Sequence, residues 1–231
     1  MTDAARDKWR EVRAMDVPVR LELGPNLADR YINDPKRVGF YMARYAATAK
    51  LLRGCHSILD IGSGDSFASI TFLNDTVASD ILCIDFDEAL VAHANQNLRP
   101  ALDLARPNDS QRIRFERRDF LTDDYFLPVE GVCCLDVIEH LQPSDSDAFF
   151  SRATDVILDG GIAVFGTPNR LASQYASAHS EVGHTNLYDA TMLRDQLERH
   201  FNRVIILSMN DSVVHFGFEG MAHYLLAACL K

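Results

Sequence analysis

The sequence predicts an α/β protein in which seven strands form one sheet, mostly parallel with an antiparallel last strand, and helices cover both faces. Two patterns support this prediction. Between residues 57 and 167, five apolar strand-like segments alternate with segments of helical periodicity, which is typical of parallel strands buried on both faces. The last two strand-like segments, residues 203–209 and 222–230, have no helix between them. They are therefore expected to pair in an antiparallel hairpin, because a parallel pair needs a longer crossover.

The elements follow one another in a regular order. Helices are expected over residues 3–15 and 35–52, and Pro35 suits a first helical turn. Strands are expected at residues 57–61, 81–86, 112–117, 131–137 and 161–167, with helices over 65–74, 87–98 and 146–158. A polar, histidine-bearing stretch, 168–188, follows the fifth strand. The next helix, 189–201, has Asp189 as its expected N-cap.

The composition restricts the classes of partner. The 231 residues carry a formal net charge of -10, which argues against binding to the phosphate backbone of nucleic acid. Four arginines between residues 112 and 118 alternate with Ile113 and Phe115, so they are interpreted as the solvent-exposed face of a strand. No apolar run is long enough to cross a membrane and no signal peptide is apparent, so a cytoplasmic location is expected. The five cysteines form no CxxC pair, which favours buried thiols.

The segment "LDIGSGDS" places a glycine turn at the end of the first strand. Phe67 and Ala68 stand where a dinucleotide fingerprint needs its third glycine. No Gly-Lys-Ser/Thr follows the turn, so nothing would hold a β- or γ-phosphate. What remains is Asp60, Gly62 and Gly64 at the carboxyl end of a strand.

Acidic residues also end the next two strands. Asp85 can accept hydrogen bonds from both hydroxyls of a ribose. Asp119 can accept from the amine of an adenine whose ring packs against Phe120 or Phe86. Each acid has a plain structural alternative: Asp60 and Asp85 as caps, and Asp119 as a loop residue. Because the carboxyl ends of consecutive parallel strands meet at one crevice, we expect all three to line a binding site there.

Four segments, "LDIGSGDS", "CIDFD", "RRDF" and "LDVIEHL", resemble in order and spacing the successive motifs of class I S-adenosylmethionine-dependent methyltransferases. The resemblance runs from about residue 57 to the end of the chain. It implies a Rossmann-like fold, S-adenosylmethionine as the methyl donor and S-adenosylhomocysteine as the product. The glycine turn would then hold the methionine part of the cofactor, and Ser66 stands where the family often has a third glycine. The implied cofactor-binding residues are Asp60, Gly62, Gly64, Asp85, Phe86, Asp119, Phe120 and Asp136.

No linker or repeat divides the chain, so we expect a single methyltransferase domain over residues 1–231. Its expected parts are an N-terminal helical lid (1–54), a cofactor-binding core (55–166), an acceptor-side loop (167–189), and a closing helix and hairpin (190–231).

Methyl transfer from a sulfonium is a direct displacement, so the protein mainly has to align acceptor, methyl group and sulfur. A hydroxyl acceptor also needs a base, for which His140 and His184 are the candidates, with Glu139 orienting His140. The alternative for each histidine is a capping or packing role, and for His179 we favour that alternative.

The same cluster supports a second mechanism. Asp136, Glu139, His140 and His184 offer oxygen and nitrogen ligands that suit Mg²⁺, Mn²⁺ or Zn²⁺, and a bound ion would lower the pKa of a hydroxyl. Some small-RNA and quinone methyltransferases that resemble this pattern use such a metal. Asp136 is shorter than the glutamate of that pattern, however, so we expect a metal-free base and leave the metal as an open alternative.

The expected function is methyl transfer to a hydroxyl or amine of a small molecule, either a sugar or an intermediate of natural-product or cell-surface polysaccharide synthesis. The alternatives are methylation of protein or RNA and a non-catalytic cofactor-binding module. A nicotinamide-dependent oxidoreductase is disfavoured by the missing third glycine. The oligomeric state is left open.

Overall fold

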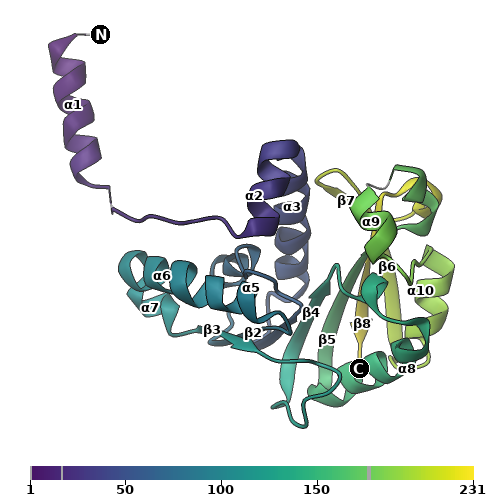
Figure 1. Cartoon of the computed structure of the whole chain (residues 1–231). Helices are drawn as coiled ribbons and strands as arrows, with labels where there is room; N and C mark the ends of the chain where they lie inside the picture. Colours follow the sequence, from purple (N-terminus) through teal and green to yellow (C-terminus); the bar gives the residue numbers. More distant parts are fainter. Residues whose placement is uncertain (1, 17, 176–177) are drawn as a thin grey trace.

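A computed structural model of the chain describes residues 2–16, 18–175 and 178–231 (Figure 1). One eight-stranded sheet forms its centre, in the order β3-β2-β1-β4-β5-β8-β6-β7. The strands are β1 (Ser57–Ile61), β2 (Asp80–Asp85), β3 (Ile113–Arg117), β4 (Val129–Leu135), β5 (Ile157–Pro168), β6 (Arg203–Asn210), β7 (Val213–His215) and β8 (Tyr224–Leu230). The first five strands pair in parallel, and β8 is antiparallel to both β5 and β6. The predicted fold class is confirmed, with the short β7 as one strand more than expected.

The α-helices are α1 (Asp3–Ala14), α2 (Pro25–Asn33), α3 (Pro35–Leu51), α4 (Thr71–Asp75), α5 (Glu88–His93), α6 (Arg99–Ala105), α7 (Pro107–Ser110), α8 (Ser146–Val156), α9 (Ala178–Gly183) and α10 (Ala190–Leu197). α1 stands away from the sheet, and the other helices lie around it (Figure 1). Shorter turns of 3-10 helix are η1 (Ala68–Ile70), η3 (Ile138–His140), η4 (Pro143–Asp145), η5 (Arg170–Tyr175) and η6 (Glu219–Met221), and η2 (Ala94–Leu98) is a π-helical turn. Among the described residues, no helix has both the length and the apolar character that a membrane crossing requires.

Each face of the sheet carries its own hydrophobic core. Successive residues of a strand point to opposite faces, and β4 shows this directly: Val132 and Cys134 face α8 and α10, while Cys133 and Leu135 face α3. All four side chains are buried, which is why this strand is continuously apolar. The helices therefore cover both faces, as expected, and leave the carboxyl ends of the parallel strands at one edge.

Some elements differ from the expected ones. The helix expected over 87–98 continues through the π-helical turn η2 into α6, with Pro100 in the first turn of α6, where a missing N–H is tolerated. α2 was not expected, although its Pro25 at the start is a helix signal. The polar stretch 168–188 contains η5 and α9, and its residues 176–177 lie outside the described residues.

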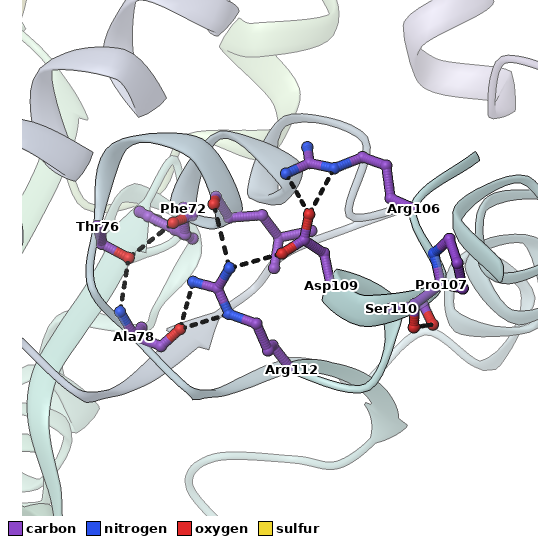
Figure 2. Close-up of polar contacts among 9 residues, drawn as sticks. Phe72, Thr76, Ala78, Arg106, Pro107, Asp109, Ser110 and Arg112 are labelled. Atoms are coloured by element: carbon purple, nitrogen blue, oxygen red, sulfur yellow. Dashed lines mark hydrogen bonds and ion pairs between the residues drawn. The ribbon is translucent and has the colours of Figure 1, made fainter.

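The arginine-rich segment around β3 stabilises the edge of the sheet. Arg112 donates from Nε to the backbone carbonyl of Ala78 at 2.8 Å, and its Nη1 lies 2.8 Å from Oδ1 of Asp109 (Figure 2). Asp109 also accepts from Nε of Arg106 at 2.8 Å, and the hydrogen bonds from Arg112 and Arg106 hold its pKa below the ordinary value. These contacts tie the start of β3 to the turn before β2. Of the four arginines expected on the exposed face of a strand, Arg114 and Arg117 lie in β3 and are exposed, whereas Arg112 and Arg118 flank it.

Candidate functional site

The glycine turn after β1 depends on three residues in the left-handed backbone region, namely Gly62 (φ 71°), Gly64 (φ 59°) and Ser66 (φ 56°). A Cβ atom on Gly62 would lie 2.2 Å from Cγ2 of Val137, so both the backbone angle and the available space require glycine there. Ser66 takes the conformation that a third glycine would adopt, and its Oγ lies 3.0 Å from Oγ of Ser63. The departure from the third-glycine pattern therefore leaves the turn intact.

Asp60 lies beneath this turn and is fully buried. Its Oδ2 accepts a hydrogen bond from Oγ of Ser69 in η1 at 2.5 Å. Burial raises the pKa of Asp60 to about 6. This placement agrees with the structural alternative, in which the carboxylate holds the turn and the helix that follows it.

Asp85 connects the turn to the second strand. Its Oδ2 accepts from the backbone N–H of Gly64 at 2.8 Å, and its Oδ1 accepts from the N–H of Asp87 at 2.9 Å. Each carboxylate oxygen can accept more than one hydrogen bond. The capping role and the expected ribose role are therefore compatible in one side chain.

Asp119 lines a cavity of about 210 Å³ at the ends of β2 and β3. The other lining residues are Phe86, Arg117, Arg118, Thr122 and Asp123. The side chain of Phe86 is 73% exposed, whereas Phe120 is buried against Phe126 and Phe149, with ring centroids 5.3 and 5.1 Å away. Of the two aromatic residues expected near an adenine, only Phe86 lines this cavity, because Phe120 serves the core under α8.

Asp136 follows β4 with a left-handed backbone (φ 56°) and pairs with Arg44 of α3. Nη1 of Arg44 lies 2.8 and 2.7 Å from the two carboxylate oxygens, and its guanidinium stacks 3.8 Å from the ring centroid of Tyr224. Sequence reasoning did not find Arg44 or Tyr224. Arg44 lies 92 residues before its partner, and neither residue belongs to a motif. The described contacts of Asp136 thus join α3 to the end of β4.

The candidate catalytic residues do come together. Glu139 and His140 lie in η3, directly after the β4 turn, and His184 follows α9. The two imidazole centroids are 5.0 Å apart, and one ligand atom from each of the three side chains lies within 4.8 Å of the others. We call these three residues the histidine cluster. The side chain of His179 lies outside the described residues.

His140 has a defined orientation. Its Nδ1 lies 2.8 Å from the backbone carbonyl of Gly183. A carbonyl oxygen only accepts hydrogen bonds, so Nδ1 carries the proton in this contact and Nε2 is the basic nitrogen of a neutral ring.

Glu139 is buried beneath the two imidazoles. Its Oε2 accepts from Oγ1 of Thr167 at 3.1 Å, and its Oε1 has no hydrogen-bond partner among the described residues. Burial and the nearby charge of Asp136 raise the pKa of Glu139 to about 8. At neutral pH the carboxyl group therefore holds its proton unless a cation lies beside it.

Comparison with known proteins adds a family-model match over part of the chain and a set of similar folds. Residues 58–161 match the family model described as "Methyltransferase domain". No curated protein matches the chain.

Several solved structures have similar folds. The methyltransferase domain of bacterial CtHen1-C is 16% identical with a TM-score of 0.68, and the match covers 83% of this chain and 99% of that one. An O-methyltransferase family protein from Burkholderia thailandensis is 13% identical with a TM-score of 0.65, over 88% of this chain and 59% of that one. The N-methyltransferase NodS from Bradyrhizobium japonicum WM9 is 12% identical with a TM-score of 0.59, over 86% of this chain and 99% of that one. At these identities the likeness concerns the fold.

Proposed function

We propose that this chain, whose residues 58–161 match a methyltransferase-domain model, is a class I S-adenosylmethionine-dependent methyltransferase that methylates a hydroxyl or amino group of a small molecule in the cytoplasm. The expected acceptors are sugars and intermediates of natural-product or cell-surface polysaccharide synthesis. The observation that carries the proposal is the histidine cluster, which gives the carboxyl end of β4 a basic nitrogen. The cluster follows Val137, whose side chain lies against Gly62 of the glycine turn, so base and cofactor turn are neighbours.

In the proposed mechanism the protein binds, orients and manages one proton. Bound S-adenosylmethionine supplies the methyl group, which a direct displacement moves to the acceptor. Asp85 and Asp119 hold the ribose and the adenine. His140 takes the proton of an acceptor hydroxyl at Nε2 while the Gly183 carbonyl keeps Nδ1 protonated and the ring in place. The imidazolium then returns this proton to water.

A divalent metal is a second candidate, and one specific observation favours it. Oε1 of Glu139 is buried without a partner among the described residues, while the cluster's ligand atoms lie within 4.8 Å of one another. Glu139, His140 and His184 would hold the ion, which would lower the pKa of an acceptor hydroxyl. The contact from Nδ1 of His140 to a backbone carbonyl also suits a metal ligand that binds through Nε2. Asp136 is engaged by Arg44, so three protein ligands are the expected set.

The test of this function is label transfer. The protein is incubated with methyl-labelled S-adenosylmethionine and a small-molecule extract, and the products are identified by mass spectrometry. His140→Ala or His184→Ala is expected to lower turnover by about 10² to 10⁴, the usual scale for a lost general base, with nearly unchanged affinity for S-adenosylhomocysteine. The matched control is His56→Ala, an exposed histidine on the segment before β1.

Other outcomes separate the alternatives. If EDTA abolishes turnover and one added divalent ion restores it, the metal candidate replaces the metal-free base. If neither histidine variant loses more than a few fold, the acceptor is a group that needs no base. Label found only in added protein or RNA would overturn the small-molecule acceptor.

A further inference from the structure

Residues 183–186, which we call the docking segment, lie against η3. Nδ2 of Asn186 donates a hydrogen bond to the carbonyl of Ile138 at 3.2 Å, and the backbone N–H of Asn186 donates to the carbonyl of Glu139 at 3.0 Å. Both acceptors belong to η3. One asparagine thus joins the docking segment to η3 through its side chain and its backbone.

The backbone on both sides of His184 is also tied to this part of the chain. The residue before it, Gly183, accepts from Nδ1 of His140 at 2.8 Å, and the residue after it, Thr185, donates from Oγ1 to the carbonyl of Leu141 at 3.0 Å. Together the contacts of the docking segment reach four consecutive residues. The place of the second imidazole beside the first therefore depends on these contacts.

Asn186 connects the docking segment to the core as well. Its Nδ2 lies 2.9 Å from Oγ of Ser146 at the start of α8 and 2.7 Å from the hydroxyl of Tyr188. Ser146 and Tyr188 are buried, and their hydroxyl oxygens lie 3.0 Å apart. On the other side of the segment, Glu181 and Val182 are exposed. Among the described residues, the segment is therefore held from its carboxyl-terminal end, where Asn186 lies.

The Gly183 carbonyl decides which nitrogen of His140 is basic. With this acceptor at Nδ1, the proton of the neutral ring stays on Nδ1 and leaves Nε2 as the base. A histidine side chain in water carries its proton mainly on Nε2, so His140 would lose its basic Nε2 if the docking segment moved away. The segment thus determines the chemical form of the ring as well as its place.

We propose that Asn186 is a positioning residue of the histidine cluster. It holds the docking segment on η3, and it thereby keeps the proton of His140 on Nδ1 and the imidazole of His184 beside that ring. This inference deepens the proposed function and rests on it, because a base at Nε2 of His140 is what Asn186 supports. Asn186 acts through these contacts rather than on the acceptor.

The test reads the tautomer of His140 by NMR. The full chain is labelled in the ring nitrogens of its histidines and observed with EDTA at about pH 7.5, above the ordinary imidazole pKa of about 6.5. His140→Gln identifies the signals of His140 among those of the eight histidines. The native chain is expected to carry the proton on Nδ1. Asn186→Asp, which keeps the shape but lacks the donor, and Asn186→Ala, which adds no charge, are both expected to move it to Nε2.

Asn95→Asp is the matched control. Nδ2 of Asn95 donates to the carbonyls of Val91 and Phe115 at 3.0 and 3.1 Å, at the β3 edge of the sheet. The control removes a comparable donor and is expected to leave the tautomer of His140 unchanged. Because a loss of stability alone does not change the tautomer in a folded chain, this readout separates positioning from a merely structural role. An unchanged affinity for S-adenosylhomocysteine shows that each variant is folded.

The outcomes separate this inference from the proposed function. A native His140 that carries its proton on Nε2, or one that keeps it on Nδ1 in both Asn186 variants, would overturn the positioning role. In the label-transfer experiment, Asn186→Ala is expected to lower turnover by about 10²-fold, the scale for a misplaced catalytic group. If the tautomer changes as expected but turnover does not, or no small molecule accepts label, the positioning role stands and the proposed function is overturned.

Discussion

At the scale of single residues, Asp85 shows how one carboxylate can serve both the backbone and a ligand. Asp85→Asn keeps one acceptor oxygen for the N–H of Gly64 or Asp87 but loses the negative charge. We expect affinity for S-adenosylhomocysteine to fall by about 1.5–3 kcal/mol, the range for hydrogen bonds to charged groups, with the fold retained. Calorimetric titration measures this, and Asp87→Asn, which conserves the cap of α5, is the matched control. Unchanged affinity in folded Asp85→Asn would refute the ribose assignment.

The pKa of Glu139 predicts how stability depends on pH. In the folded protein its pKa is about 8, against an ordinary value of 4.5. Between these values the unfolded chain has lost the proton while the folded chain keeps it, so rising pH favours unfolding throughout this window. Glu139→Gln removes this dependence and should gain stability relative to the native chain as the pH rises from 5 to about 8.

Urea denaturation at several pH values in the presence of EDTA measures this difference. EDTA keeps a metal from ionising the carboxyl group. If the unfolding free energies of the native chain and of Glu139→Gln change with pH in parallel, the carboxyl group is ionised in the folded protein and the prediction is wrong.

The site was predictable where residues follow strand ends. Asp60, Asp85, Asp119, Glu139 and His140 could be placed because strand periodicity and topology fix which chain positions meet at the carboxyl edge. The segment that contains these motifs, residues 58–161, matches a family model described as "Methyltransferase domain". What could not be predicted is side-chain packing between distant segments. Arg44 shows this, because its contact with Asp136 depends on how α3 crosses the sheet.

At the scale of elements, the pair of Arg44 and Asp136 holds α3 against the end of β4. Both side chains are mostly buried, so removing one leaves the other poorly solvated. We expect Arg44→Ala to lower the free energy of unfolding by about 1–3 kcal/mol. The control is Arg114→Ala, whose partner Asp80 is half exposed and whose pair should contribute less than about 1 kcal/mol. Urea denaturation of both variants provides the comparison. Equal losses of unfolding free energy would show that the Arg44 pair stabilises the fold no more than an exposed ion pair does.

Local signals predicted element type better than element extent. The helix over 87–98 was recognised from its apolar spacing, but its continuation into α6 depends on packing of Leu102 into the core. The short β7 pairs only with β6 at the sheet edge, and its three residues carry too few alternations to form a pattern. In both cases tertiary contacts decide where the element begins or ends, and a short stretch of sequence does not reveal those contacts.

At the scale of the whole molecule, the two parts of the N-terminal region differ. α1 buries no residue and stands away from the sheet (Figure 1). The segment that follows contacts the body: the Glu22 carbonyl lies 3.0 Å from Nε2 of His93, and Gly24 is buried against Asp65 of the glycine turn. Within the expected N-terminal lid, residues 18–24 are therefore the candidates for covering the cofactor, because they contact both α5 and the glycine turn.

This difference leads to a prediction about the lid. A Cβ atom on Gly24 would lie 2.0 Å from Oδ2 of Asp65, so in Gly24→Ala either the segment or the Asp65 side chain must move. We expect a loss of about 1–3 kcal/mol in unfolding free energy, the usual cost of overpacking, and weaker binding of S-adenosylhomocysteine because Asp65 adjoins Gly64.

Two controls isolate the segment. Gly39→Ala adds the same methyl group in α3, where nothing lies within 4 Å, and should increase stability by about 0.5–1 kcal/mol without changing affinity. Removal of residues 1–16 should change neither quantity, since α1 buries nothing. Urea denaturation and calorimetric titration measure both. If the truncation weakens the binding of S-adenosylhomocysteine as much as Gly24→Ala does, α1 belongs to the lid. If Gly24→Ala leaves the affinity intact, residues 18–24 do not cover the cofactor, because a segment displaced from the turn would have exposed it.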